Sequence, residues 1–346
     1  MKIGVHLSWD APDDWASAAR FAVEAERLGV DSLWTGEAWG WDGATPLAYV
    51  AGQTSRVRLG TSILKIGART PALTAMTALS LASMSGDRFV LGLGTSTPQI
   101  MEGWDGVPFE APLRRTRELV ELVRLMTSGQ RVTYAGQVYQ APLPGEARPM
   151  RSSAPPRRVP IYIAAVGPQN LRLTGELADG WIGNCFVPET GAAFLDPLRA
   201  GAERAGRSLS DLELQAPVSL EFDDDLDAVT KRHARGYAFT FGAMGAPERN
   251  FYVAAFARQG FEVVREVHRL WLEGHREEAQ ELVPPELAWR TNLLGTDATV
   301  KERLRAYRSA GIDSLRVALR GANNRERLGD LERLLGLVRE VEREAP

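Results

Sequence analysis

Two short segments carry residue types that can bind phosphate groups. Each follows a buried-strand pattern, at residues 88–94 and 159–166. Small residues leave backbone N–H groups approachable, hydroxyls hydrogen-bond phosphate oxygens, and a helix after the second segment would offer free N–H groups to an anion. The first segment is Gly94, Thr95, Ser96 and Thr97, and the second is Val166, Gly167 and Pro168. We therefore expect phosphate-binding backbone here, although both segments also fit ordinary turns without a ligand.

An acid and a base candidate lie close to the ends of the first two expected strands. Glu37 follows the strand pattern at 31–35 and is flanked by glycine and tryptophan, so burial would raise the pKa of its carboxyl group. His6 lies in the first strand pattern and could donate a proton from a position at the strand end. We predict both as catalytic residues. The alternatives are a surface ion pair for Glu37 and an ordinary core position for His6.

Three tryptophans belong to the same expected loops. Trp9 follows the first strand, and Trp39 and Trp41 follow the second. Indole rings stack on planar ligands, so these side chains are predicted to line a substrate pocket. Ordinary packing of loops over the protein core would explain each of them equally well.

Composition excludes several classes of function. A net charge of −3 over 346 residues gives no reason to expect a nucleic-acid partner. No apolar run is long enough to cross a membrane, and residues 1–10 lack the regions of a signal peptide, so we expect a cytoplasmic protein. One cysteine and four histidines without H-x-H or H-E-x-x-H spacing make a protein-bound metal unexpected.

The elements that must position these residues alternate between strand and helix patterns. Expected strands begin near residues 2, 31, 57, 88, 159, 180, 213 and 313, with helical periodicity between most of them. Eight such units predict an α/β fold of the (β/α)8 barrel type, a TIM barrel. We expect one domain over residues 1–346, with a loop insertion at about 130–158 and a helical insertion at about 223–292.

A doubly wound open sheet is the alternative fold. It predicts a dinucleotide fingerprint after an early strand, and Gly92-Leu93-Gly94 begins like one. However, Thr97 occupies the third glycine position, and residues 98–112 are expected to be irregular instead of opening a helix. The barrel is therefore preferred.

Taken together and in order, four segments resemble the bacterial luciferase-like superfamily of flavin- and deazaflavin-dependent oxidoreductases. They are GVDSLWTGEAWGWD at 29–42, the stretch from RLGTSILKIG to FVLGLGTS at 58–96, PIYIAAVGPQN at 160–170 and LADGWIGN at 177–184. The resemblance is strongest to the branch that uses coenzyme F420, which includes methylenetetrahydromethanopterin reductase. It implies a TIM barrel, a small-molecule substrate and a homodimer.

The resemblance also implies positions for the cofactor. In the family the third strand ends in a bulge with a non-prolyl cis peptide bond behind the ring, and the matching residues are Thr61, Ser62 and Ile63. The phosphate side of the family's site matches the two segments described above. Trp181 is implied to lie beside the cofactor.

Departures from the family narrow the expected reaction. Sugar-phosphate and alcohol dehydrogenases of the branch carry Asp-His where this chain has Glu37 and Ala38, and a Glu where it has Ser96 or Thr97. We therefore expect a reductase that passes hydride from F420 to an unsaturated acceptor, with Glu37 anchoring the ring or assisting proton transfer. Alternatives are an FMN-dependent monooxygenase supplied by a separate reductase, and a flavin-binding barrel without turnover.

A polyglutamyl cofactor tail would favour a basic rim. Five arginines are candidates for that rim: Arg69, Arg148, Arg151, Arg157 and Arg158.

Overall fold

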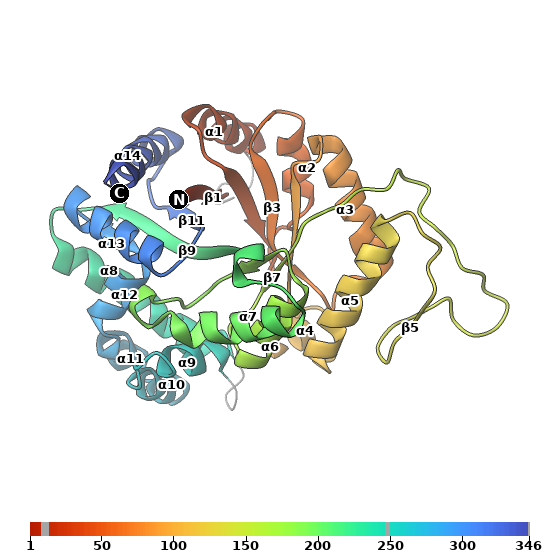
Figure 1. The fold of residues 1–346 in the computed structure, drawn as a ribbon. Helices are drawn as coiled ribbons and strands as arrows, with labels where there is room; N and C mark the ends of the chain where they lie inside the picture. Colours follow the sequence, from red (N-terminus) through yellow and green to blue (C-terminus); the bar gives the residue numbers. More distant parts are fainter. Residues whose placement is uncertain (8–13, 246–249, 345–346) are drawn as a thin grey trace.

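Eight parallel strands close into a barrel in the computed structural model, which describes residues 1–7, 14–245 and 250–344 (Figure 1). Strand β9 pairs with both β11 and β8, and this second pairing closes the ring. The strands are β1 (Lys2–His6), β2 (Ser32–Gly36), β3 (Arg58–Lys65), β4 (Phe89–Gly94), β7 (Ile161–Ala164), β8 (Gly180–Ile182), β9 (Glu213–Phe222) and β11 (Ser314–Leu319). The predicted (β/α)8 barrel is confirmed, and the open sheet is wrong.

Helices surround the barrel and pack their apolar faces on its outer side. They are α1 (Trp15–Leu28), α2 (Thr45–Ala51), α3 (Pro71–Ser85), α5 (Pro112–Thr127), α6 (Pro168–Leu177), α7 (Ala192–Arg204), α13 (Asp297–Ser309) and α14 (Asn324–Arg343). Local signals set their ends: Asp14 caps α1 by accepting from the Ser17 N–H, and Gly29 ends it in the left-handed conformation. Within the described residues, no helix is long and apolar enough to span a membrane.

One helix lies where the sequence predicted irregular chain. Helix α4 (Pro98–Gly103) begins directly after Thr97, whose hydroxyl accepts from the Ile100 N–H. A threonine cap followed by proline in the first turn is a favourable helix start. The expectation for 98–112 was therefore wrong over its first turns, because this capping signal was overlooked.

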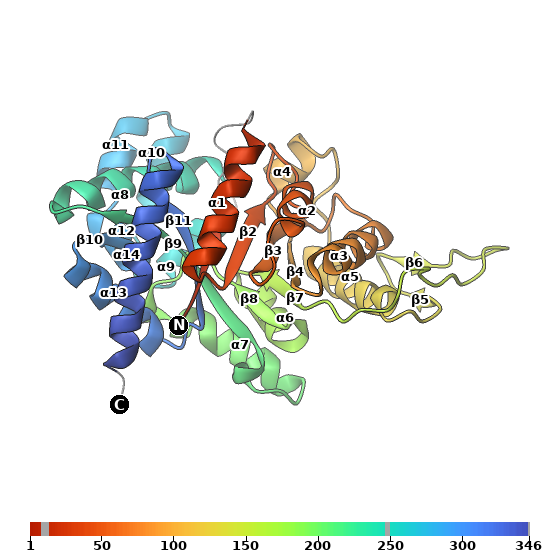
Figure 2. The same ribbon diagram turned by 90° about the horizontal axis from the view of Figure 1, so that it is seen from above.

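Both expected insertions are present. Residues 130–158 form an arm that extends away from the barrel and carries the short strands β5 (Tyr134–Ala135) and β6 (Gln140–Ala141) (Figures 1 and 2). The helical insertion comprises α8 (Leu226–Ala243), α9 (Phe251–Ala257), α10 (Val264–Leu272), α11 (Arg276–Leu282) and α12 (Pro285–Thr291). The short strand β10 (Leu293–Gly295) follows and pairs with the end of β9. Figure 2 shows α10 and α11 on the side of the barrel opposite the N-terminus.

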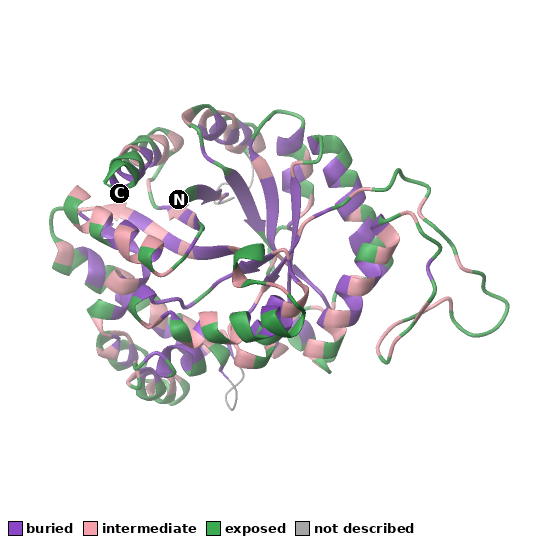
Figure 3. Ribbon diagram, in the orientation of Figure 1, coloured by how far each residue is buried: buried purple, intermediate pink, exposed green. Residues whose placement is uncertain are grey.

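The amino end of the barrel, where its strands begin, is filled. The Trp34 ring occupies the interior, and a Cβ atom on Gly60 would lie 2.2 Å from it, so glycine is required there. Below it, Arg58 donates to both carboxylate oxygens of Glu213 at 2.8 and 3.1 Å, and Lys2 donates to the same carboxylate at 2.6 Å. Most strand residues are buried, although β9 has several of intermediate exposure (Figure 3). A ligand site inside the barrel therefore has to lie at the carboxyl end.

Candidate active site

A bulge in β3 shapes one half of the carboxyl end. The strand register shifts after Gly60, and the Thr61 and Ser62 carbonyl oxygens come so close to β4 that a Cβ atom on Gly92 would lie 1.7 and 2.8 Å from them. The Thr61 hydroxyl fixes this arrangement, since it accepts from the Gly92 N–H and donates to the Gly92 carbonyl. The bulge expected from the family resemblance is therefore present.

The cis peptide bond expected within this bulge is not. The Ser62–Ile63 bond is trans, and the cis bond found in the described ranges joins Ala141 to Pro142. Without proline the trans form is favoured by about 3 kcal/mol, and the Thr61 hydrogen bonds hold the bulge without a cis bond.

The bulge presents an apolar surface beside an unused polar group. Ile63 is half-buried, and a Cβ atom on Gly94 would lie 2.8 Å from its side chain. The buried Ser62 hydroxyl has no hydrogen-bond partner. A flat apolar surface with a free hydroxyl at its edge suits a planar ring that carries polar edge atoms.

The second predicted phosphate segment has an open helix N-terminus. Gly167 precedes α6 without any side-chain cap, and a Cβ atom added to it would meet nothing within 4 Å. Arg258, which follows α9, donates to the Val166 carbonyl at 2.6 Å and has no carboxylate partner within the part of the chain that the structure describes. The first-turn N–H groups and this guanidinium together suit an anion. Sequence reasoning missed Arg258 because it lies in the helical insertion.

In the first segment the hydroxyl groups are partly engaged. Thr97 caps α4, and the Thr95 hydroxyl donates to the Ser96 carbonyl at 3.3 Å. Ser96 itself has a positive φ of 61°, which turns the chain sharply at the strand end. The backbone of this segment lies at the carboxyl end of the barrel, but the Thr97 hydroxyl already accepts a hydrogen bond from α4.

Glu37 is held in a network of ion pairs beside the bulge. One of its oxygens accepts from Arg69 at 2.8 Å and the other from the Lys65 N–H at 3.2 Å. The Lys65 ammonium in turn donates to Asp105 at 2.7 Å and to the Ala38 carbonyl at 3.0 Å. This arrangement fixes a carboxylate at the rim and suits an anchoring role.

The other half of the carboxyl end contains a cavity of about 280 Å³, lined by His6, Ser219, Tyr237, Thr291, Asn292 and Arg316 among others. The walls come from β1, β9 and β11, from the segment after β8 and from the helical insertion. His6 faces Gly36, since a Cβ atom there would lie 3.6 Å from its ring, and Gly36 pairs with Ile63. His6, which lines the cavity, therefore lies beside the strand position that pairs with the bulge.

Arg316 projects from β11 into this cavity. The neighbouring residues Leu315 and Val317 are fully buried in the outer core, so the alternation of the strand turns Arg316 inward. Its hydrogen bond is a long one, 3.5 Å to the Gln215 side chain, and burial lowers the pKa of its guanidinium to about 10. Sequence reasoning overlooked Arg316, although a cation within the strand pattern DSLRVAL was a usable signal.

Neutral polar groups form the wall opposite the strands. Tyr237 contacts the Thr291 hydroxyl at 2.6 Å and accepts from Asn292 at 3.1 Å. The side-chain amide oxygen of Asn292 accepts from the Ser219 N–H at 2.8 Å, which ties the helical insertion to β9. Burial raises the pKa of Tyr237 and keeps its hydroxyl neutral.

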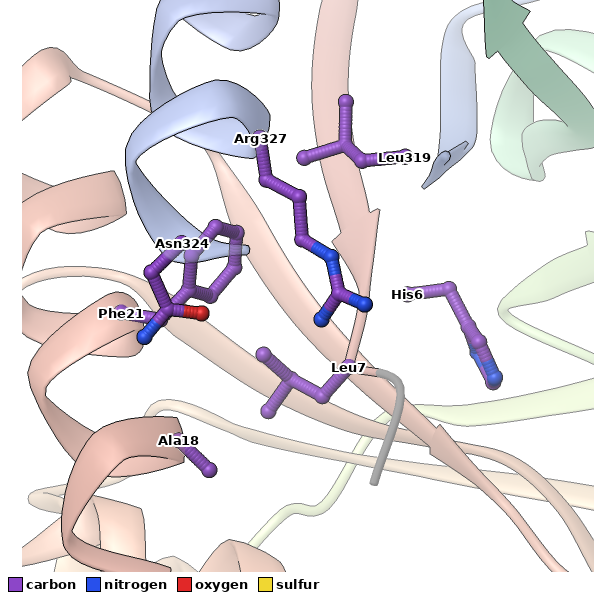
Figure 4. A pocket seen from close by; sticks show the side chains of 7 residues that line it. All are labelled: His6, Leu7, Ala18, Phe21, Leu319, Asn324 and Arg327. Carbon is purple, nitrogen blue, oxygen red and sulfur yellow. The ribbon is translucent and has the colours of Figure 1, made fainter. Parts of the chain in front are cut away.

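A smaller cavity lies on the far side of β1, between α1 and α14 (Figure 4). Arg327 and Asn324 of α14 face Leu7 and Phe21 across it. Its volume of about 20 Å³ admits roughly one water molecule. It is too small for an organic substrate and is not a candidate substrate site.

The predicted aromatic wall is only partly assembled. Trp39 and Trp41 are about half exposed, and Trp41 packs edge-on against Trp15 at 5.2 Å. Trp9 lies outside the described residues. Trp181 requires a correction: it is fully buried, donates to the Ala165 carbonyl at 2.9 Å and packs on Phe186 and Phe194. Strand alternation turns its ring outward, away from the cavity.

The five arginines expected to form one basic rim do not form a single surface, so this prediction is wrong. Arg69 pairs with Glu37, and Arg148 and Arg151 are exposed on the arm. Arg157 bonds Asp87 just before β4 begins, and Arg158 lies beside it just before β7, so both belong to the amino end of the barrel.

Comparison with known proteins gives a consistent picture. The family described as luciferase-like monooxygenase matches residues 1–314. A Mycobacterium tuberculosis protein named as a coenzyme F420-dependent oxidoreductase is 36% identical, covering 97% of this chain and 99% of its own length. A 5,10-methylenetetrahydromethanopterin reductase of Archaeoglobus fulgidus is 28% identical, covering 90% of this chain and 91% of its own. The solved coenzyme F420 dependent tetrahydromethanopterin reductase from Methanopyrus kandleri shares the fold, with a TM-score of 0.79, 23% identity and 97% of each chain covered.

Proposed function

Because this chain belongs to the luciferase-like monooxygenase family, we propose that it is a coenzyme F420-dependent oxidoreductase that reduces a small organic substrate. The observation that carries the proposal is the division of the carboxyl end into two adjoining halves. The β3 bulge and the α6 N-terminus suit a cofactor with a planar ring and a phosphate, and the cavity of about 280 Å³ beside them suits a small substrate. Bound and reduced, the deazaflavin would supply a hydride.

The residues of the first half fit this cofactor. Ile63 and the free Ser62 hydroxyl would support the ring, and the N–H groups after Gly167 with the Arg258 guanidinium would hold the phosphate. Residues 94–97 would line the same side of the site. The protein's own contribution is to bind, orient and keep water away from the ring.

The second half would handle the substrate. His6 lies between the cavity and the bulge, where its ring could give a proton to the substrate. Glu37, fixed by Arg69, would anchor the rim of the cofactor site. Trp39 and Trp41 would cover the ligand from the loop after β2.

We also propose that the protein is a homodimer. Exposed apolar side chains gather on α2 and α3, namely Tyr49, Leu73, Met76 and Met84. The three on α3 follow helical spacing and so share one face. Light scattering would test this, and a monomeric mass at micromolar concentration would contradict it.

The test of the cofactor site uses Gly167, whose φ of −82° any residue can adopt. Gly167→Asp would cap α6 and place a negative charge where the phosphate is expected, and Gly167→Ala is the matched neutral control. Titration of apoprotein with F420, followed by fluorescence, should show binding weakened about 10-fold or more by Asp and little changed by Ala. The proposal would be contradicted if Gly167→Asp and Gly167→Ala bound F420 with equal affinity, or if the wild type preferred FMN to F420.

A further inference from the structure

Arg316 is an inward-facing cation for which the described part of the chain offers no counter-ion. No carboxylate oxygen of the described residues lies within the 4.0 Å salt-bridge distance of its guanidinium. Two other arginines removed from solvent are paired, Arg58 with Glu213 and Arg303 with Glu189. Arg316 is half-buried, and a charge withdrawn from water is costly unless it is paired, so an unpaired one facing a cavity indicates a binding role.

The cavity around Arg316 would admit an anion without repulsion. Its volume of about 280 Å³ lies at the lower limit for small-molecule sites, which restricts it to a short ligand. No aspartate or glutamate among the described residues lines it, and its other polar groups include the neutral side chains of Ser219, Tyr237 and Asn292. The planar guanidinium fork matches the two oxygens of a carboxylate.

The register of the strands relates Arg316 to the reacting groups. Arg316 pairs with Gly4 on β1, and His6 lies two residues further along that strand, roughly 7 Å nearer the carboxyl end. The His6 ring lies next to Gly36, which pairs with Ile63 of the bulge. A short molecule held by Arg316 at one end would therefore extend past His6 toward the place proposed for the cofactor ring.

We propose that the substrate is a small α,β-unsaturated carboxylic acid whose carboxylate binds Arg316. This rests on the proposed function, because the hydride comes from the reduced deazaflavin. The β carbon of the substrate gains that hydride and the α carbon gains a proton from His6, so one C=C π bond breaks and two C–H bonds form. The acid is reduced and the deazaflavin is oxidised by two electrons. Pairing with Arg316 offsets the carboxylate charge that would otherwise oppose hydride addition.

The experiment measures binding, not turnover, by calorimetry on protein loaded with oxidised F420. The probes are crotonate, its neutral methyl ester and inorganic phosphate. Arg316→Met removes the charge at similar volume, Arg316→Lys keeps a charge without the fork, and Arg339→Met changes an exposed arginine as the control. Crotonate should bind the wild type and the Arg339→Met variant, and the ester and phosphate should not. Arg316→Met should lose about 30-fold or more in crotonate affinity, and Arg316→Lys should lose less.

Three results would overturn the inference: no binding of crotonate to the wild type at millimolar concentration, phosphate binding as strong as crotonate, or unchanged crotonate affinity in Arg316→Met. F420 affinity of each variant is measured separately by fluorescence. A loss of F420 affinity in Arg316→Met would assign the arginine to the cofactor and also overturn the inference. Failure of the proposed function looks different: the wild type would not bind F420, yet apoprotein would still bind crotonate through Arg316.

Discussion

Two inward-facing arginines lie at opposite ends of the same barrel and have opposite surroundings. At the amino end, Arg58 donates twice to Glu213, and these bonds outweigh burial and raise the pKa of its guanidinium. At the carboxyl end, Arg316 has a long contact with Gln215, and burial lowers the pKa of its guanidinium to about 10. Both residues are arginines on barrel strands, so the opposite shifts of their pKa values come from the presence or absence of a carboxylate partner among the described residues.

This contrast distinguishes a charged residue that stabilises the fold from one that is available to bind a ligand. The network of Lys2, Arg58 and Glu213 satisfies its own groups and closes the amino end. Arg316 lacks such compensation and faces a cavity, which is the arrangement expected of a group that completes its interactions with a ligand. Replacing Arg58 should therefore lower the free energy of unfolding, whereas replacing Arg316 should leave it unchanged or raise it.

The largest expected effect comes from Arg58→Met. Removing the guanidinium leaves Glu213 largely buried with only Lys2 beside it, so the free energy of unfolding should fall by about 2–4 kcal/mol. Urea denaturation of apoprotein followed by circular dichroism measures this. A loss below about 1 kcal/mol would mean that the amino-end network is not a stabilising closure.

Glu213→Gln tests the same network through pH. Burial opposes ionisation of Glu213, but the hydrogen bonds from Arg58 and Lys2 prevail and lower its pKa below the ordinary 4.5. The folded pKa lies below the unfolded one, so this carboxylate stabilises the protein above pH 4.5 and ceases to do so as the pH falls through the lowered value. The stability gap between wild type and Glu213→Gln, about 1–3 kcal/mol at pH 7, should narrow on acidification. Urea denaturation of both proteins at a series of pH values measures this difference in stability. A difference that stays constant with pH would contradict the assignment.

Arg316→Met should act in the opposite direction. Replacing an unpaired, half-buried charge with an apolar side chain of similar volume should leave apoprotein as stable as the wild type or about 1–2 kcal/mol more stable. The same urea measurement applies. A loss as large as that of Arg58→Met would show that Arg316 is structural and would remove the contrast between the two ends.

Lys2→Met should have the smallest effect. Its ammonium lies 2.6 Å from Glu213, but the side chain is 48% exposed, so water screens the pair. The expected loss is about 0.5 kcal/mol, and added salt should reduce it further. A loss comparable to that of Arg58→Met would place the main stabilising contact on Lys2 instead.

The sequence predicted the eight strands and both insertions because strand and helix periods are local signals. It could not predict which face of a strand lies inside when both faces are apolar. The family resemblance placed Trp181 beside the cofactor, whereas its ring is turned outward and packs on Phe186. For the same reason Arg316 was overlooked, since its inward direction follows from the register of β11 on β1.

Other misses concern which end of the barrel a residue occupies. Arg157 and Arg158 lie close to the cofactor segments in sequence, but they precede β7 and so belong to the amino end. Arg258 reaches the α6 N-terminus from a helix 90 residues later in the chain, a contact that no local pattern contains. The partners of Glu37 were also out of reach of the sequence, because Arg69 follows β3 and meets it only after folding.

A crystal structure of the protein with bound F420 would test the central claim most directly. The account predicts the ring against Ile63 and Ser62, the phosphate at the α6 N-terminus beside Arg258, and Arg316 still facing the cavity without touching the cofactor. A ring bound elsewhere than at the carboxyl end of the barrel, or cofactor oxygens bonded to Arg316, would contradict it.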